Sequence, residues 1–364
     1  MNTAYVFVFI TSFITLFIMR KIAKKIGLVD KPNARKLHQG VVPLVGGISV
    51  YISLLIGLTF FLPISLNLEL YLLCSAILIV LGAFDDYFDI SFKIRLLVQA
   101  GISLAMIWGG GHSLHHLGYL MGSDSIELNE FFGSLITIIA VIGAINAFNM
   151  VDGIDGLLGG LASVTFTALG VTFYLSGNDY LGEICLLIVA ALIPYIMLNL
   201  GFPLGRRFKI FMGDAGSMFI GFSVIWMLIR GTQEPSIDAF KPVTALWLIA
   251  IPLMDMATIM IRRIRKGHSP FKPDREHLHH ICQRMGLSSL MTLFVICLLA
   301  SICAVVGIVA DINGVAESTM FISFLVMFAV YFTAINHIWR ITTWVNNRRK
   351  FKMNYVYNGN DKDI

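Results

Sequence analysis

Eleven apolar runs, separated by short polar stretches, constrain this sequence more than any other feature. A transmembrane helix takes roughly 17 to 25 predominantly apolar residues, and the runs are close to that length. They cover residues 3–19, 44–62, 69–84, 94–110, 131–148, 159–176, 181–200, 213–230, 242–261, 290–310 and 319–339. Charged residues make up only 13% of the chain, against about 25% in a soluble domain. The sequence therefore predicts an all-α, polytopic integral membrane protein with about eleven transmembrane helices.

Lysine and arginine residues fall almost entirely on one side of the predicted membrane. If the N-terminus lies outside, 25 of the 27 occupy inside loops or the C-terminal tail. Because positively charged residues are retained on the cytoplasmic side, this bias predicts an outside N-terminus and supports the odd number of helices. We expect residues 1–339 to form one transmembrane domain and residues 340–364 to form a basic cytoplasmic tail.

The third apolar run ends in three acids, Asp85, Asp86 and Asp89, in the stretch LGAFDDYFDISFKIR. An unpaired charge near the bilayer interior costs about 2.5 kcal/mol or more, so these acids indicate a functional site. Adjacent carboxylates also repel, so a metal, a base or a raised pKa must neutralise at least one. The alternative is a solvated helix end whose acids interact with Lys93 and Arg95, although negative charge at a helix C-terminus opposes the helix dipole.

Two further inside loops carry acids among glycines. In NAFNMVDGIDG, at 146–156, polar residues recur at three-residue spacing: Asn146, Asn149, Asp152 and Asp155. A plain turn would also use Asn, Asp and Gly, but it would not need amides within an apolar helix, where they must find partners. In FMGDAGS, at 211–217, Asp214 stands at the start of an apolar run and Ser217 follows it. Asp214 is either a helix N-cap or a metal ligand beside a helix-start anion site.

The loop after the ninth run combines Arg262 and Arg265 with three histidines, His277, His279 and His280. Positive-inside bias accounts for most of the arginines. The histidines lack a complete set of zinc ligands at suitable spacing, so imidazoles beside a phosphate are the favoured interpretation.

Two features within the apolar runs also stand out. Asp255 lies inside the ninth run, which makes it either a functional acid or one that pairs with a neighbouring helix. Gly46 and Gly47, at the start of the second run, indicate close helix packing or a break.

The motifs DDYFD, NAFNMVDGIDG, FMGDAGS and HLHH follow one another on predicted inside loops. In this order they resemble the polyprenyl-phosphate N-acetylhexosamine-1-phosphate transferase superfamily, most closely its bacterial branch that uses N-acetylglucosamine. The likeness extends to GLVDKPNARKLHQGVVPLVGGISVY at 27–51, PYIMLNLG at 194–201 and SPFKPDREHLHH at 269–280. In the sister family that makes a peptidoglycan lipid intermediate, the acidic motif ends in lysine and three histidines are consecutive. This chain has Asp89 where the sister family has the lysine, and HLHH where the sister family has three consecutive histidines. Both differences favour the branch that uses N-acetylglucosamine.

The resemblance implies a bacterial inner-membrane enzyme with a periplasmic N-terminus and an active site on cytoplasmic loops. It would transfer N-acetylglucosamine 1-phosphate from UDP-N-acetylglucosamine to undecaprenyl phosphate and release UMP, the first membrane step of O-antigen or a related surface polysaccharide. The implied cofactor is Mg²⁺, with Mn²⁺ as its alternative. The expected partners are the two substrates and the lipid bilayer, with no nucleic acid, and we consider a homodimer.

The resemblance and the physical arguments together divide the roles. Asp214 would be the leading Mg²⁺ ligand with Asp86 second, and Asp85 would be the base that deprotonates or orients the lipid phosphate. The catalytic candidates are Asp85, Asp86, Asp152 and Asp155. The candidates for substrate binding are Asn149, Asp152, Asp155, Ser217, Arg262, Arg265, His277, His279 and His280.

Two alternatives stay open at this point. One is the same reaction with another UDP-sugar, either UDP-N-acetylgalactosamine or UDP-N-acetylmuramoyl-pentapeptide. The other is an ion-coupled membrane transporter, since intramembrane acids and broken helices also mark ion pathways. The acids of this chain, however, gather at one predicted membrane face, whereas transporter sites lie near the midplane.

Overall fold

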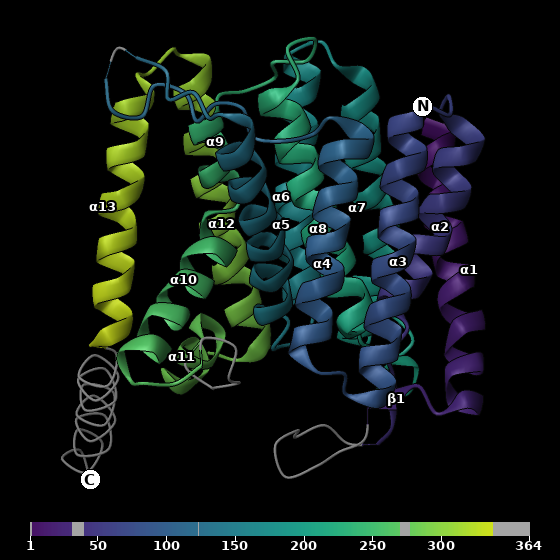
Figure 1. Cartoon of the computed structure of the whole chain (residues 1–364). Coiled ribbons are helices and arrows are strands. Elements are labelled where there is room, and N and C mark those ends of the chain that lie inside the picture. The colour runs from purple at the N-terminus through teal and green to yellow at the C-terminus, as the bar shows by residue number, and fades with distance from the viewer. Residues whose placement is uncertain (1, 31–39, 123, 270–276, 338–364) are drawn as a thin grey trace, which may run out of the picture.

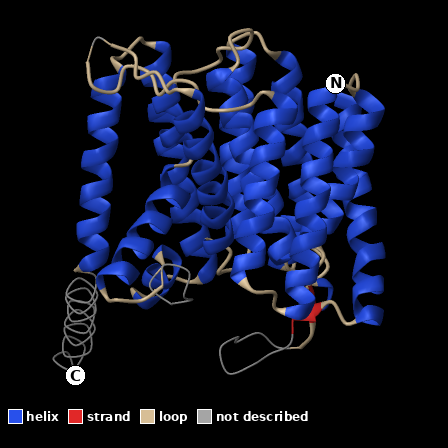
Figure 2. Cartoon of the chain, viewed as in Figure 1, coloured by secondary structure: helices blue, strands red, loops and turns tan. Residues whose placement is uncertain are grey.

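The computed structural model describes residues 2–30, 40–122, 124–269 and 277–337, which form a bundle of helices lying side by side (Figure 1). The longer helices are α1 (Asn2–Ile26), α2 (Gly46–Phe61), α3 (Leu66–Phe88), α4 (Phe92–Gly110), α5 (Glu130–Met150), α6 (Leu157–Leu175), α7 (Asp179–Leu200), α8 (Gly213–Gln233), α10 (Ala250–Arg265), α12 (Ser289–Ile312) and α13 (Glu317–Asn336). The short elements are η1 (Arg206–Phe208), α9 (Pro242–Leu248) and α11 (Leu278–Arg284), with strands β1 (Val29–Asp30) and β2 (Val42–Pro43), which pair antiparallel (Figure 2).

Nine of the described helices have both the length and the hydropathy of a membrane span: α1, α3 to α8, α12 and α13. The prediction of a helical, polytopic membrane protein is confirmed. The exact number of eleven spans is not, because α2 has only 16 residues and the ninth apolar run is two helices, α9 and α10, bent by 82°.

Pro252 explains the bend between α9 and α10. It lies in the first turn of α10, where the missing N–H of proline does no harm. A continuous helix would require that N–H to bond the carbonyl of Leu248, the last residue of α9, and the proline ring would meet that carbonyl. The helix therefore ends before the proline and starts again in a new direction.

Polar N-caps start several of the spans. The side chains of Ser65, Asn129, Asn178 and Ser288 each accept a hydrogen bond from the backbone N–H three residues on, at the starts of α3, α5, α7 and α12. Such caps satisfy N–H groups that have no partner within the helix.

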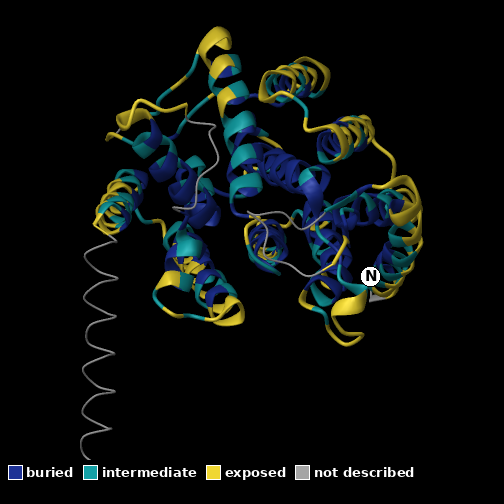
Figure 3. Ribbon diagram, turned by 90° about the horizontal axis from the view of Figure 1, so that it is seen from below, coloured by how far each residue is buried: buried dark blue, intermediate teal, exposed yellow. Residues whose placement is uncertain are grey.

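Helix α8 lies at the centre of the bundle, and the whole apolar window of this span is buried. Seen from the lower end in Figure 3, buried segments occupy the middle and exposed ones the rim. Small residues allow α2 and α3 to pack closely against α8. A Cβ atom on Gly47 would overlap the Gly216 backbone, and one on Gly82 would overlap the Ala215 backbone. The close packing predicted for the start of the second run is therefore observed, between α2 and α8.

The starts of α2 and α8 are also joined through their backbones. The amides of Gly46 and Gly47 donate to the carbonyls of Phe211 and Met212 at 2.9 and 3.0 Å, and the Phe211 amide donates to the Pro43 carbonyl at 2.9 Å. These bonds hold the FMGDAGS segment at the lower end of the bundle in Figure 1, opposite the N-terminus. The predicted C-terminal tail, 340–364, lies outside the described residues.

Candidate active site

Asp85 and Arg95 form an ion pair where α3 ends and α4 begins. Arg95 Nη1 lies 2.5 Å from Asp85 Oδ2, and Asp85 Oδ1 accepts from the Ile90 amide at 2.9 Å. The Asp85 side chain is only 3% exposed. Its charge is thus buried but compensated by an arginine and a backbone donor, which is the arrangement that makes a buried carboxylate tolerable. Asp89, by contrast, is the exposed C-cap of α3, with φ 53°.

The Asp86 carboxylate caps α8 from the neighbouring helix. Its Oδ1 accepts from the Asp214 amide at 2.9 Å, and its Oδ2 is 3.4 Å from the Ala215 amide. Gly213 makes this contact feasible, because its φ is +76° and a Cβ atom there would overlap Asp86 Oδ2. The capping role that the sequence offered to Asp214 therefore belongs to Asp86, while Asp214 lies within the first turn of α8.

The Asp214 carboxylate lies close to polar side chains from two other helices, α4 and α5. Asn149 Nδ2, at the end of α5, donates to Asp214 Oδ1 at 2.7 Å and to Ser217 Oγ at 2.8 Å. Arg95 Nη1 lies 3.7 Å from Asp214 Oδ2, and the Asp214 side chain remains 37% exposed. The motifs that carry Asp85, Asn149 and Asp214 thus meet around one carboxylate with an accessible oxygen.

The turn between α5 and α6 carries the next two acids. Asp155 Oδ2 accepts from Lys209 Nζ at 2.7 Å. Asn199 holds the turn in place, because its Oδ1 accepts from the Gly156 amide at 2.6 Å and its Nδ2 donates to the Ile210 carbonyl at 2.7 Å. Asn199 and Lys209 therefore connect the segment that precedes α8 to the acidic turn.

Asp152, in the same turn, is an exposed residue, yet protein groups near its carboxylate remove part of its solvation. Desolvation, and then the neighbouring carboxylates Asp214 and Asp155, raise the pKa of Asp152 from 3.8 to about 7. The proximity of like charges also shows that the 151–156 turn and Asp214 belong to one electrostatic site.

The histidine motif is anchored by Asp255 of α10. Asp255 Oδ2 is 2.8 Å from His277 Nδ1, and Asp255 Oδ1 accepts from the Leu278 amide at 3.0 Å and from Tyr331 Oη at 2.8 Å. Of the two interpretations left open for Asp255, pairing with a neighbouring segment is the one observed. His280 packs on His279, with ring centroids 4.2 Å apart.

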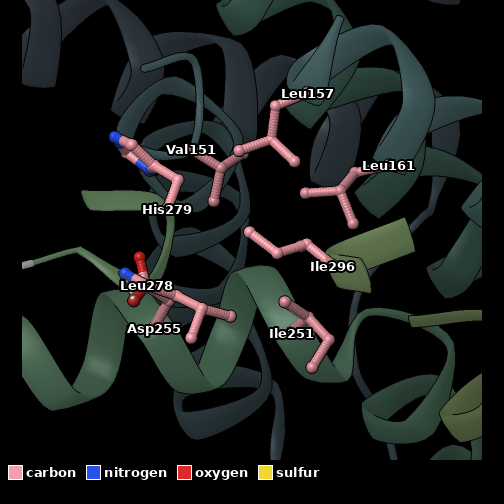
Figure 4. Close-up of a pocket in the computed structure, with 8 residues that line it drawn as sticks. All are labelled: Val151, Leu157, Leu161, Ile251, Asp255, Leu278, His279 and Ile296. Carbon is pink, nitrogen blue, oxygen red and sulfur yellow. Dashed lines mark hydrogen bonds between the residues drawn. The ribbon is translucent and has the colours of Figure 1, made fainter. Parts of the chain in front are cut away.

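His279 connects the histidine motif to the acidic turn. A Cβ atom on Gly153 would overlap His279 Nε2, so the imidazole lies directly against the turn. Figure 4 shows His279 and Asp255 at one edge of an apolar pocket that Val151, Leu157, Leu161, Ile251, Leu278 and Ile296 complete. Burial, and then His280 and His277, lower the pKa of His279 to about 3, with Asp255 acting in the opposite direction. The imidazole is therefore neutral at pH 7.

The two arginine candidates lie in the last turn of α10. The guanidinium of Arg265 stacks over the ring of Phe332, 5.0 Å from its centroid, so it points to α13. Arg262 is half-buried.

The described residues contain no group of three or more histidine, cysteine or acidic side chains arranged to hold a metal by themselves. Mg²⁺, however, usually takes one or two protein carboxylates and completes its shell with water and substrate phosphate. Asp214, with its accessible oxygen, fits that requirement, whereas both Asp86 oxygens already face backbone amides.

Sequence reasoning missed the cations and amides that organise the site. Lys209 was counted only toward membrane topology, yet it forms an ion pair with Asp155. Arg95 was considered only as a partner of acids at a solvated helix end, yet it pairs with the buried Asp85. Asn199 lies in PYIMLNLG, a stretch quoted only for its resemblance. Its polar side chain so close to the end of an apolar run was the available signal, because a buried amide must find partners.

The fold and the site define a polytopic membrane protein with a carboxylate-rich candidate active site at one end of its bundle. Residues 68–232, which include Asp85, Asn149 and Asp214, match the family Glycosyl transferase family 4. The undecaprenyl-phosphate alpha-N-acetylglucosaminyl 1-phosphate transferase of Escherichia coli O157:H7 is 48% identical over 97% of this chain and 96% of its own length. The proteins of the same name from Salmonella typhi and Haemophilus influenzae are 50% and 45% identical, over 95% and 94% of this chain and 93% and 96% of theirs. The chain belongs to the family of undecaprenyl-phosphate alpha-N-acetylglucosaminyl 1-phosphate transferases.

Proposed function

We propose that the protein transfers N-acetylglucosamine 1-phosphate from UDP-N-acetylglucosamine to undecaprenyl phosphate and releases UMP. The observation that carries this proposal is full-length similarity to transferases of that name, in a chain whose motifs meet around Asp214. The chemistry suits the place, because the acceptor phosphate is tied to a lipid and the donor is soluble, so their reaction needs a site at a membrane edge.

Arg95 and Asp85 form the acceptor side of this proposal. An incoming lipid phosphate carries negative charge and competes with Asp85 for the guanidinium of Arg95, which lies within 3.7 Å of Asp214 as well. Asp85, once released from that ion pair, takes the proton of the phosphate or orients it. A phosphate oxygen then attacks the β-phosphorus of the donor, forming the new pyrophosphate bond while the bridging oxygen leaves with UMP.

The donor side consists of the amide, acid and histidine side chains around the 151–156 turn. Asn149 and Ser217 position Asp214. Asp152 and Asp155 lie in the neighbouring turn, and His279 packs against that turn at Gly153. Neutral His279 offers a hydrogen bond to a phosphate or sugar oxygen without adding a charge. Mg²⁺ or Mn²⁺, held by Asp214, would neutralise the phosphates that have to come together.

Gly153→Ala is expected to lower transfer by roughly 10-fold to 100-fold, because the new methyl group displaces His279 from the turn, and a shift of about 1 Å can cost that much. Initial rates at saturating and limiting donor measure the effect. Gly101→Ala is the matched control, since a Cβ atom there meets nothing within 4 Å. Equal rates for Gly153→Ala and wild type would show that the contact with His279 is unimportant.

Transfer of radiolabel from a panel of UDP-sugars into undecaprenyl phosphate tests the proposed reaction. We expect lipid-linked product from UDP-N-acetylglucosamine, far less from UDP-N-acetylgalactosamine or UDP-N-acetylmuramoyl-pentapeptide, and none after chelation of divalent ions. Labelled UMP should not exchange into the donor without acceptor, because attack is direct. Absence of lipid product with every sugar would contradict the proposal and favour the transporter alternative.

We also propose that the protein resides in the bacterial inner membrane with its active-site end toward the cytoplasm. The support is the lysine and arginine bias together with a site that lies at the end opposite the N-terminus. UDP-sugars do not cross a bilayer, so externally added donor should yield product in inside-out vesicles and not in right-side-out vesicles.

A further inference from the structure

Asp255 is a buried acid that the proposed reaction does not use. Its residue surface is 2% exposed, and three groups donate to its two oxygens or lie within hydrogen-bond distance of them: His277 Nδ1, the Leu278 amide and Tyr331 Oη. These partners come from α11 and α13, two elements separated by α12 in sequence. Asp255 thus joins three parts of the chain at a single carboxylate.

The bonds made by Asp255 hold the start of α11. This helix has only seven residues, and its N-cap residue, His277, makes no side-chain capping bond of its own. A helix that short is not stable by itself, so its position depends on what it packs against and what caps it. The Leu278 amide is a first-turn donor of α11, and Asp255 satisfies it from outside.

The position of α11 determines where His279 lies. The rings of His277 and His279 are parallel to within 4°, with centroids 5.7 Å apart, so the two imidazoles stack at the start of α11. His279 is 2% exposed, and its Nε2 has no hydrogen-bond partner among the described residues. A buried nitrogen without a partner carries a free-energy cost that a bound oxygen acceptor or donor would remove. That nitrogen faces Gly153 of the acidic turn.

We propose that Asp255 and Tyr331 are positioning residues that hold α11 so that His279 meets the UDP-sugar donor. The inference rests on the proposed function, because it assigns the donor to the His279 side of the site. Tyr331 fixes the Asp255 carboxylate, Asp255 fixes His277 and the start of α11, and α11 presents the free nitrogen of His279. Neither Asp255 nor Tyr331 touches substrate.

Steady-state kinetics of Asp255→Asn and Tyr331→Phe test the inference. We expect Tyr331→Phe to raise the KM for UDP-N-acetylglucosamine by roughly 3-fold to 10-fold, which corresponds to the net contribution of one ordinary hydrogen bond. Asp255→Asn should raise this KM further, because an NH₂ group replaces one of the two carboxylate oxygens. That NH₂ group cannot accept a hydrogen bond from His277 or from the Leu278 backbone N–H. The KM for undecaprenyl phosphate should stay within about twofold of wild type in both variants, because the acceptor side is untouched.

Tyr174→Phe is the matched control, because Tyr174 also gives a hydroxyl to a buried acid, Glu183, at 3.3 Å, between α6 and α7. It should leave both KM values unchanged. A merely structural role for Asp255 would reduce the amount of active enzyme, and so kcat, without altering donor KM. An unchanged donor KM in active Asp255→Asn enzyme would overturn the inference alone. A wild-type enzyme that makes no lipid product would instead overturn the proposed function and, with it, the donor assignment.

Discussion

Asp214→Asn is expected to lower N-acetylglucosamine 1-phosphate transfer by about 100-fold or more, the range seen when one electrostatic contact to a transition state is removed. Asparagine has the shape of aspartate, so the first turn of α8 should survive. What changes is charge: one oxygen that faces Asn149 or Arg95 becomes an N–H donor directed at another donor. Rates measured across a Mg²⁺ titration should also show a higher half-maximal concentration.

Asp89→Asn is the control for this variant. It makes the same chemical change at an exposed acid with φ 53°, a conformation that asparagine tolerates well. We expect Asp89→Asn to keep wild-type rates and wild-type Mg²⁺ dependence. If Asp214→Asn retained the wild-type Mg²⁺ dependence while losing rate, the assignment of Asp214 as the leading metal ligand would be wrong.

The helical fold was predictable from the sequence because a lipid bilayer permits few backbone structures. Backbone groups in the bilayer must bond within their own segment, so apolar runs of sufficient length become helices. All eleven runs do contain helix in the structure. The bend in the ninth run was not predicted, because its two halves together have the hydropathy of one span and hydropathy does not register Pro252 as a break.

The acids of the site were also readable from the sequence, but most of their partners were not. The cluster of acids at the end of an apolar run identified Asp85, and polar residues among glycines identified Asn149, Asp152 and Asp214. The structure brings these motifs together. Which cation meets which acid depends on helix packing. Arg95 is ten residues from its partner Asp85, whereas Lys209 is 54 residues from Asp155.

Asp86 illustrates the limit of motif reasoning most clearly. It was placed beside Asp85 as a catalytic and metal candidate because adjacent acids need neutralisation. In the structure, two backbone amides at the start of α8 partly compensate the negative charge of Asp86. These amides belong to Asp214 and Ala215, which lie 128 and 129 positions after Asp86 in the sequence. A helix cap supplied by another helix has no local sequence signal, since capping patterns are recognised within a single segment.

Arg95→Ala is expected to lower kcat/KM for undecaprenyl phosphate by about 100-fold, because it removes the cation that meets the acceptor and leaves Asp85 buried without its partner. The donor KM should change much less, since the 151–156 turn and His279 are held by other contacts. Kinetics with each substrate varied in turn measure both quantities. Asp85→Asn should likewise depress turnover more than donor binding.

Lys93→Ala separates this effect from a general loss of positive charge. Lys93 is exposed in the same turn of α4, so its removal should change acceptor kcat/KM by no more than about twofold if long-range attraction is screened. Arg95→Lys should recover only part of the activity, because an ammonium group cannot reproduce the forked contact of a guanidinium with two oxygens. A larger loss of acceptor kcat/KM for Lys93→Ala than for Arg95→Ala would contradict this prediction. It would mean that positive charge alone attracts the lipid phosphate to this face of the membrane, without a specific binding site at Arg95.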